Sequence, residues 1–460
     1  MIEQDATYGY GDLAANIAQW TRALAASSIR PGMLVGLQHD QRYLHFLLIQ
    51  ACQLLGATSV SLSRGDIAIH DPILDRCDFL CLQAPGDLSS DGMLTLSQEV
   101  VDRVIQMPVT QADLRLLDRC PGDHMILRLV KTSGSTGRPK VMAMSHAAMN
   151  ELLRKTLRIP NDPGYAWNFL NLYDFTLRSA LRETEIALRF GQTVVASSGA
   201  TLLTDMRRFV EFRCTVVSGE AMYLADSIPA DWRGPRHGLL LVKGGALSTA
   251  ARNLLRERLV THLYHNYGAN EVNRIANIGD DGVGTLEHGV RARIVDDDGV
   301  ELPIGAIGQI EVTPTLVDGY LWDPEATARA FRDGWYRTFD LGLMPEPGRL
   351  IVLGRADDMV NIGGVKFAPQ ALENRIRGLP GIRDAVLLGV PTTDGTNELI
   401  VVLETDATHL PAPLQQAIVS ILAGTVRRFT GRLRPTLPRT ETGKVQRAVL
   451  REELASAGKT

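Results

Sequence analysis

Apolar and polar residues near the start of the chain follow a pattern that predicts helices and strands in turn. Between Tyr8 and Ala26 the apolar residues stand three or four positions apart, which predicts a helix with Asp12 as its N-cap. Apolar runs at Met33–Gln38 and Thr58–Ser63 predict strands, and the run Tyr43–Ala57 between them predicts a buried helix. This alternation is typical of a parallel, doubly wound sheet.

The pattern changes in the second half of the chain. From Gly284 to Thr313 short strands alternate with turns, which predicts a small β-barrel. The acidic triplet Asp296–Asp298 reads as a hairpin turn within it rather than a metal site. Beyond a strand that ends near Gly354, a Gly-rich hairpin, a helix from Pro369 and a further strand predict a separate α+β unit.

Length and charge limit the classes of protein to consider. A chain of 460 residues is long for one hydrophobic core, so we expect two or more domains. The formal net charge is 48 − 52 = −4 with no long basic tract, so nucleic acid is not an expected partner. The sequence has no apolar run of the roughly 18–20 residues that span a bilayer, and its polar N-terminus lacks a signal-peptide pattern. Five cysteines, without zinc spacing, fit a reduced cytoplasmic protein.

The segment Lys131–His146 concentrates candidate chemistry. An apolar run at Met125–Val130 predicts a strand before it, and the residues from Met142 onward read as the start of a helix. A Gly- and Ser-rich loop between a strand and a helix exposes backbone N–H groups that bind phosphate. A solvated turn is the alternative. A Walker loop is excluded, because Pro139 precedes Lys140 and valine follows it.

Further turn segments carry polar or flexible residues, and each is ambiguous alone. They are the Gly-Gly turn at Gly244–Leu247, Tyr267–Glu271, the strand end at Asp340, Gly354–Asp358, and the polar segment Leu437–Arg447. Glycines allow a flat ligand to approach the backbone, and a carboxylate suits a pair of ribose hydroxyls.

These segments occur once each and in one order, and together they resemble the adenylate-forming enzymes. That superfamily comprises acyl-CoA synthetases, adenylation domains of nonribosomal peptide synthetases, and luciferases. The segment TYGYGDL resembles the family's first core segment, so the resemblance covers nearly the whole chain. Three residues depart from the usual pattern: Val141 and Phe339 replace glycines, and Asn270 replaces a threonine.

The resemblance implies an α/β fold with a large N-terminal domain of doubly wound sheets plus a small β-barrel at residues 1–353. A hinge follows at 354–358, centred on Asp357, and a small mobile α+β domain at 359–460 acts as a lid. Lys140, Glu271 and Lys444 are the implied catalytic residues, with Glu271 and Thr136 as ligands of Mg²⁺. The implied nucleotide-binding residues are Thr132, Ser133, Gly134, Ser135, Thr136, Gly137, Gly244, Gly245, Ala246, Asn266, Tyr267, Gly268, Asn270, Asp340 and Arg355.

The implied acid-binding residues are Tyr173, Asp174 and Gly268. In amino-acid-activating members an aspartate at the position of Asp174 pairs with the substrate ammonium. The alternative is that Asp174 caps a helix predicted over Thr176–Phe190.

The resemblance implies that ATP and Mg²⁺ activate a carboxylic acid, possibly an amino acid, as an acyl-adenylate with release of pyrophosphate. The acyl group would then pass to a thiol of coenzyme A or of a carrier protein supplied in trans. Three alternatives stay open: a non-catalytic or regulatory relative, a ligase for an aryl or aliphatic acid without an amino group, and a luciferase-type oxidation.

Overall fold

A computed structural model describes most of the chain. The described residues are 1–3, 6–89, 91–119, 122–132, 139–156, 168–196, 207–208, 216–219, 232, 238–243, 247, 249–362, 365–391, 397–423, 425–426, 428–439 and 445–457.

The first layered unit is a six-stranded sheet in the order β6-β5-β3-β4-β7-β8, counted over the described residues. Its strands are β3 (Leu34–Gln38), β4 (Thr58–Ser61), β5 (Phe79–Leu82), β6 (Met93–Thr95), β7 (Ile126–Thr132) and β8 (Lys140–Ser145). The helices and turns among them are α1 (Tyr10–Ala26), α2 (Arg42–Leu54), α3 (Arg64–Ala68), α4 (Gln98–Ile105), α5 (Gln111–Leu114), η1 (Leu74–Arg76) and η2 (Arg115–Asp118). All neighbours pair in parallel except β7 and β8, which confirms the predicted parallel arrangement.

Helix α1 begins differently from the prediction. Its N-cap is Gly9, and Asp12 is the third helical residue. The Asp12 carboxylate accepts a hydrogen bond from the Gly9 backbone N–H at 2.8 Å, so it caps the helix from inside its first turn. The prediction of Asp12 as the N-cap was therefore wrong. A carboxylate can accept hydrogen bonds from the free backbone N–H groups at a helix start either from the residue before the helix or from within its first turn.

A second, fourteen-stranded sheet runs through the middle of the described structure in the order β16-β17-β19-β20-β15-β14-β13-β12-β11-β9-β10-β1-β2, with β18 beside β19. Its bounds are β1 (Ile2–Glu3), β2 (Ala6–Thr7), β9 (Phe169–Asn171), β10 (Val194–Ala196), β11 (Val216–Gly219), β12 (Leu239–Lys243), β13 (His262–Ala269), β14 (Asn273–Ile278), β15 (Gly284–Leu286), β16 (Arg291–Val295), β17 (Gly308–Thr313), β18 (Phe331–Arg332), β19 (Trp335–Leu343) and β20 (Arg349–Arg355). The helices of this part are α6 (His146–Thr156), α7 (Arg178–Arg189), α10 (Thr249–Arg258) and α11 (Pro324–Ala330).

The strands from β9 to β13 pair in parallel, whereas those from β13 to β20 are antiparallel. The segment predicted as a β-barrel forms β15, β16 and β17, which belong to this antiparallel part of the sheet.

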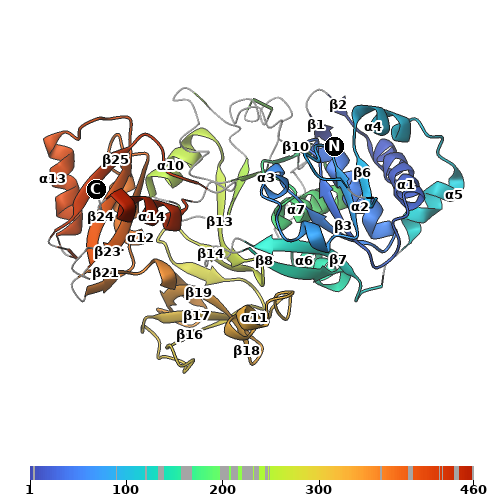
Figure 1. Cartoon of the computed structure of the whole chain (residues 1–460). Helices are drawn as coiled ribbons and strands as arrows, with labels where there is room; N and C mark the ends of the chain where they lie inside the picture. The colour runs from blue at the N-terminus through green and yellow to red at the C-terminus, as the bar shows by residue number, and fades with distance from the viewer. Residues whose placement is uncertain are drawn as a thin grey trace.

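The C-terminal part of the chain lies to one side in Figure 1, coloured orange to red. It contains η3 (Ala356–Asp358), β21 (Val360–Ile362), β22 (Val365–Phe367), α12 (Gln370–Arg377), β23 (Asp384–Pro391), β24 (Asn397–Glu404), α13 (Ala412–Leu422), β25 (Thr430–Arg434) and α14 (Arg447–Ala457). Two hydrophobic clusters draw their buried members only from residues Val360 to Leu454. This part therefore has apolar cores of its own on both faces of the β23-β24-β25 sheet.

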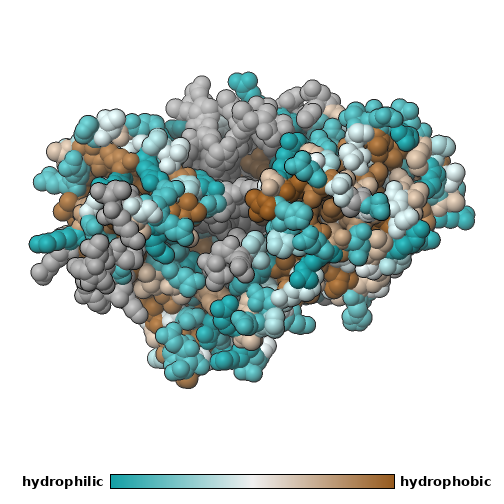
Figure 2. Space-filling model, in the orientation of Figure 1, coloured by the Kyte–Doolittle hydropathy of each residue, from teal (hydrophilic) through white to brown (hydrophobic). Residues whose placement is uncertain are grey.

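On the face shown in Figure 2, hydrophilic residues are interspersed with smaller groups of apolar ones. Among the described helices, none has the length and apolar character required to cross a membrane.

Candidate functional site

The predicted phosphate-binding loop joins two antiparallel strands. Strand β7 ends at Thr132 and β8 begins at Lys140, with Thr132 opposite Lys140 in the register. The helix that was predicted directly after the loop begins only at His146, so the strand–loop–helix prediction was wrong. The reason is a two-residue period: Met142 and Met144 are fully buried while their neighbours are half-buried, which is the pattern of a strand.

Lys140 lies in an aromatic and acidic environment built by distant segments. Its Nζ is 4.8 Å from the centre of the Tyr320 ring and 5.5 Å from that of Phe339. The Tyr320 hydroxyl donates a hydrogen bond of 2.7 Å to Oε1 of Glu271, which is buried. Burial lowers the pKa of Lys140, and the negative charge of Glu271 opposes that shift. A cation and a carboxylate thus face the same aromatic side chain.

Phe339 has a backbone φ of 60°, in the left-handed region that favours glycine. This torsion gives a physical reason for the glycine that the resemblance leads one to expect here. In this chain the phenylalanine takes up the strained torsion, and its ring lies against Lys140. Such a backbone costs on the order of 1–3 kcal/mol.

A second polar group forms around Asp340 on β19, with Arg355 from the adjacent β20 and Tyr267 from β13, farther along the same sheet. The Tyr267 hydroxyl donates to Oδ2 of Asp340 at 2.6 Å, and Nη1 of Arg355 donates to Oδ1 at 3.2 Å. Burial and the Asp340 carboxylate raise the pKa of Tyr267 well above its usual value. Burial would lower the pKa of Arg355, but the charge of Asp340 raises it overall. The two hydrogen bonds therefore hold the carboxylate of Asp340 in one orientation.

The β13–β14 turn requires glycine at position 268. The register shifts between Tyr267 and Gly268, and a Cβ on Gly268 would stand only 2.1 Å from the backbone oxygen of Asn273. Beside it, Asn266 is buried, and its amide oxygen has no hydrogen-bond partner within the described structure. An unpaired buried amide costs free energy unless a ligand pairs with it.

Asn270 lies beside α7. Its Oδ1 accepts a hydrogen bond of 3.4 Å from Nε of Arg178, the first residue of that helix. The predicted acid-binding residues Tyr173 and Asp174 precede the same helix. Asp174 is exposed, and its Oδ1 accepts a 2.8 Å hydrogen bond from the Thr176 backbone N–H. The helix begins at Arg178 with Leu177 as N-cap, so the predicted start at Thr176 was two residues early.

Several predicted residues lie outside the described part of the chain. They are Ser133, Gly134, Ser135, Thr136 and Gly137 of the loop, the turn Gly244, Gly245 and Ala246, and Lys444. Thr132, at the end of β7, is described and buried. The predicted hinge residue Asp357 lies in η3 and is exposed.

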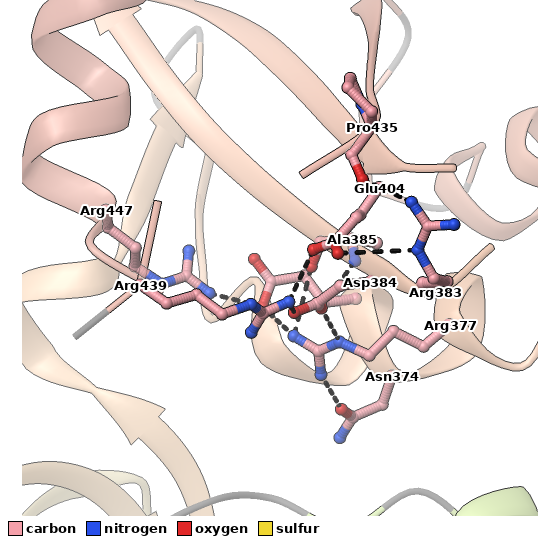
Figure 3. A network of polar contacts seen from close by, with 10 residues as sticks. Asn374, Arg377, Arg383, Asp384, Ala385, Glu404, Pro435, Arg439 and Arg447 are labelled. Atoms are coloured by element: carbon pink, nitrogen blue, oxygen red, sulfur yellow. Dashed lines mark hydrogen bonds and ion pairs between the residues drawn. The ribbon is translucent and has the colours of Figure 1, made fainter. Parts of the chain in front are cut away.

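The segment that carries Lys444 is bounded by two anchored arginines. Arg439 pairs with Val445 in an isolated antiparallel bridge, so the two ends of the segment lie together. Nη2 of Arg439 donates to Oδ2 of Asp384 at 2.8 Å and to Oε2 of Glu404 at 2.6 Å. Figure 3 shows these side chains converging from β23, β24 and the chain before α14.

Arg447 anchors the other side of this segment. Its Nη2 donates to Oε2 of Glu373 at 2.6 Å, and Glu373 is only 1% exposed. Its Nε lies 3.5 Å from Oδ2 of Asp358, next to the predicted hinge residue. Arg447, the first residue of α14, thus connects the start of that helix to α12 and to the turn at the predicted hinge.

Among the described residues, no group of three or more His, Cys, Asp and Glu side chains could hold a metal ion. Mg²⁺ bound with a nucleotide usually takes one or two carboxylates and completes its shell with phosphate oxygens and water. The buried carboxylate of Glu271, close to Lys140, fits that smaller requirement.

Comparison with known proteins decides the family. Residues 92–321, half of the 460-residue chain, match the family described as "AMP-binding enzyme". The chain belongs to the AMP-binding enzyme family. Among its relatives is the 3-hydroxybenzoate–CoA ligase of Aromatoleum sp. (strain CIB), 30% identical over 364 residues, which covers 72% of this chain and 66% of the ligase.

The nonribosomal peptide synthetase asqK of Emericella nidulans is 25% identical over 492 residues, covering 98% of this chain and 18% of the synthetase. The ATP-bound crystal structure of MatB from Rhodopseudomonas palustris matches with a TM-score of 0.83 at 24% identity, over 99% of this chain and 95% of MatB. The likeness to MatB shows that the two proteins share a fold. The predicted superfamily and the α/β fold class are confirmed.

Neither Tyr320 nor Arg178 was predicted from the sequence as a site residue. Nothing in the local sequence distinguishes the hydroxyl of Tyr320. Arg178 had a detectable signal, since Arg178, Leu181, Arg182 and Glu185 share one face of the predicted helix at helical spacing. Charged residues on a face that also carries buried leucine indicate a polar site rather than plain core.

Proposed function

We propose that this protein uses ATP to convert a carboxylic acid into an acyl-adenylate and then transfers the acyl group to a pantetheine thiol. The observation that supports it is the convergence of Lys140 from β8, Glu271 from the β13–β14 turn and Tyr320, beside the oriented carboxylate of Asp340 on β19. The fold positions a cation, a candidate Mg²⁺ ligand and a candidate ribose acceptor from separate segments.

In the first half-reaction a carboxylate oxygen of the acid attacks the α-phosphorus of ATP. The bond between the α-phosphorus and the α,β-bridging oxygen breaks, and pyrophosphate leaves with the electron pair. Lys140 would stabilise the negative charge on the phosphates, and Asp340 would orient the ribose through its hydroxyls. Mg²⁺ held by Glu271 and Thr136 would supply further charge neutralisation.

In the second half-reaction a thiolate attacks the acyl carbon, the acyl–oxygen bond breaks, and AMP leaves. We propose that residues 359–460 form a lid that turns about Asp357 between the two half-reactions. The lid would place Lys444 at the adenylate in the first step and remove it in the second. The thiol would be that of coenzyme A or of a carrier protein; a relative named as a CoA ligase and one named as a nonribosomal peptide synthetase both match this chain.

Acid-dependent exchange of labelled pyrophosphate into ATP tests the proposal. We expect exchange with one class in a panel of aromatic, aliphatic, dicarboxylic and amino acids. Glu271→Gln should reduce it by about a hundredfold or more, because a transition-state charge contact is lost. If ATP binds but no acid supports exchange above the Glu271→Gln background, the chain is a non-catalytic relative and the proposal is wrong.

A further inference from the structure

Three buried arginines lie on or beside α7, whose first residue contacts Asn270 of the candidate site. Arg178 and Arg182 lie on α7 and Arg128 lies on β7, and their exposed fractions are 5%, 3% and 1%. Arginine is almost never fully buried unless it is paired. Arg182 pairs with Glu183 at 3.2 Å, and Arg128 donates to the Ser61 hydroxyl at 3.1 Å and to the Phe175 carbonyl.

Arg178, like Arg128, is buried with part of its guanidinium unpaired. Its Nε donates to Asn270 at 3.4 Å, its Nη1 has no hydrogen-bond partner, and it forms no ion pair with any described residue. Burial, with Arg182 and Arg128 acting in the same direction, lowers the pKa of Arg178 to about 9. The guanidinium therefore keeps its charge at neutral pH, and among the described residues the carboxylate of Glu271 acts on it without forming an ion pair.

The position of Arg178 links the acid-binding segment to the reacting groups. It follows Tyr173 and Asp174 in the chain, and its partner Asn270 directly precedes Glu271, whose charge also acts on it. The phosphates already have Lys140 as a cation, on which the charge of Glu271 also acts. An anion that satisfies Arg178 is therefore most simply part of the acid.

We propose that Arg178 binds a second carboxylate of the acid, so that the substrate is a dicarboxylic acid; this rests on the proposed function. A guanidinium fork engages both oxygens of a carboxylate, which suits a carboxylate that does not react. The reacting carboxylate must keep an oxygen lone pair available for phosphorus. An ammonium is disfavoured here, since it would meet a buried cation, while Asp174 is exposed and bonded to its own turn.

The test measures acid-dependent pyrophosphate exchange by the full chain. The probes are dicarboxylic acids of increasing length, the monomethyl ester of each, and amino acids. We expect kcat/KM for the preferred diacid to exceed that for its monoester by about a hundredfold or more, because the ester leaves a buried charge unpaired. Equal use of diacid and monoester, or a preference for amino acids, would overturn the inference and leave the proposed function standing.

Variants separate a role in substrate binding from a role in folding. Arg178→Met should lower the diacid rate by about a hundredfold and leave the monoester rate nearly unchanged, while Arg178→Lys keeps part of the preference. The matched control is Arg252→Met, which removes an arginine of equal 5% exposure that pairs with Asp280, and it should keep the diacid preference.

Binding of ATP, measured by calorimetry, should be the same in Arg178→Met and wild type. If Arg178→Met lowers diacid and monoester rates equally, the guanidinium acts on the nucleotide or the reacting carboxylate and the inference fails. If ATP binds to the wild type but no acid supports exchange, the proposed function itself fails.

Discussion

Phe339 holds a left-handed backbone torsion that favours glycine, and this gives a test of strain against packing. Phe339→Gly and Phe339→Val both remove the ring from Lys140, but only glycine fits a φ of 60° without strain. We expect Phe339→Gly to be more stable than Phe339→Val by about 1–2 kcal/mol in urea unfolding. Equal stability of the two variants would show that the torsion is not held in solution.

The charge of Lys140 should make the rate of pyrophosphate exchange depend on pH. Burial lowers its pKa from the ordinary value of 10.5, so the amine loses its proton at a lower pH than a solvated lysine. If its charge serves adenylation, the exchange rate should fall on the alkaline side below pH 10.5. Lys140→Arg should move this decline to higher pH, because a guanidinium stays protonated. An unchanged alkaline decline in Lys140→Arg would assign it to another group.

The resemblance implied Lys140, Glu271 and Asp340 as one set, and the structure brings Lys140 and Glu271 close together. The resemblance supplied their order, but it did not supply their neighbours. Tyr320 and Phe339 reach Lys140 through tertiary packing between β8 and segments far along the chain. No local pattern encodes which aromatic ring a distant strand places beside a lysine.

At the scale of elements, the ion pair between Arg447 and the buried Glu373 connects α14 to α12. Arg447→Met leaves Glu373 buried without its closest cation, although Arg377 lies 3.5 Å away. We expect a loss of about 3 kcal/mol in the free energy of unfolding, measured with urea. Arg447→Met with Glu373→Gln should recover much of that loss, since the unpaired charge is gone. A single variant as stable as wild type would contradict this role of the pair.

The spacing of apolar residues predicted some helices and strands correctly and others wrongly. The helix and strand pattern from Tyr8 to Ser63 predicted α1, β3, α2 and β4 closely, because each buries one face or both against a neighbouring layer. The segment Lys140–Ser145 was mispredicted because alternating Met and small residues also occur at the start of an amphipathic helix. Pairing with β7 decides the outcome, and that contact is not local.

At the scale of the whole molecule, the proposed lid has apolar cores of its own, and the chain reaches it through η3. Asp357→Pro fixes φ near −65° and should hold one orientation of the proposed lid. We expect one half-reaction, pyrophosphate exchange or thiol transfer from added adenylate, to slow by about tenfold or more while the other changes little. Asp357→Ala is the control and should slow neither selectively. If the proline variant retains both rates, residues 354–358 are not the hinge.

In the proposed reaction a carboxylate oxygen of the acid attacks the α-phosphorus of ATP. The fate of that oxygen can be followed with substrate acid labelled with ¹⁸O in its carboxylate, by mass spectrometry of the products after thiol transfer. We expect one ¹⁸O atom in AMP and none in pyrophosphate, because the oxygen that attacks phosphorus stays with AMP when the acyl–oxygen bond breaks. Label in pyrophosphate or inorganic phosphate, or thioester formation with unlabelled AMP, would rule out this mechanism.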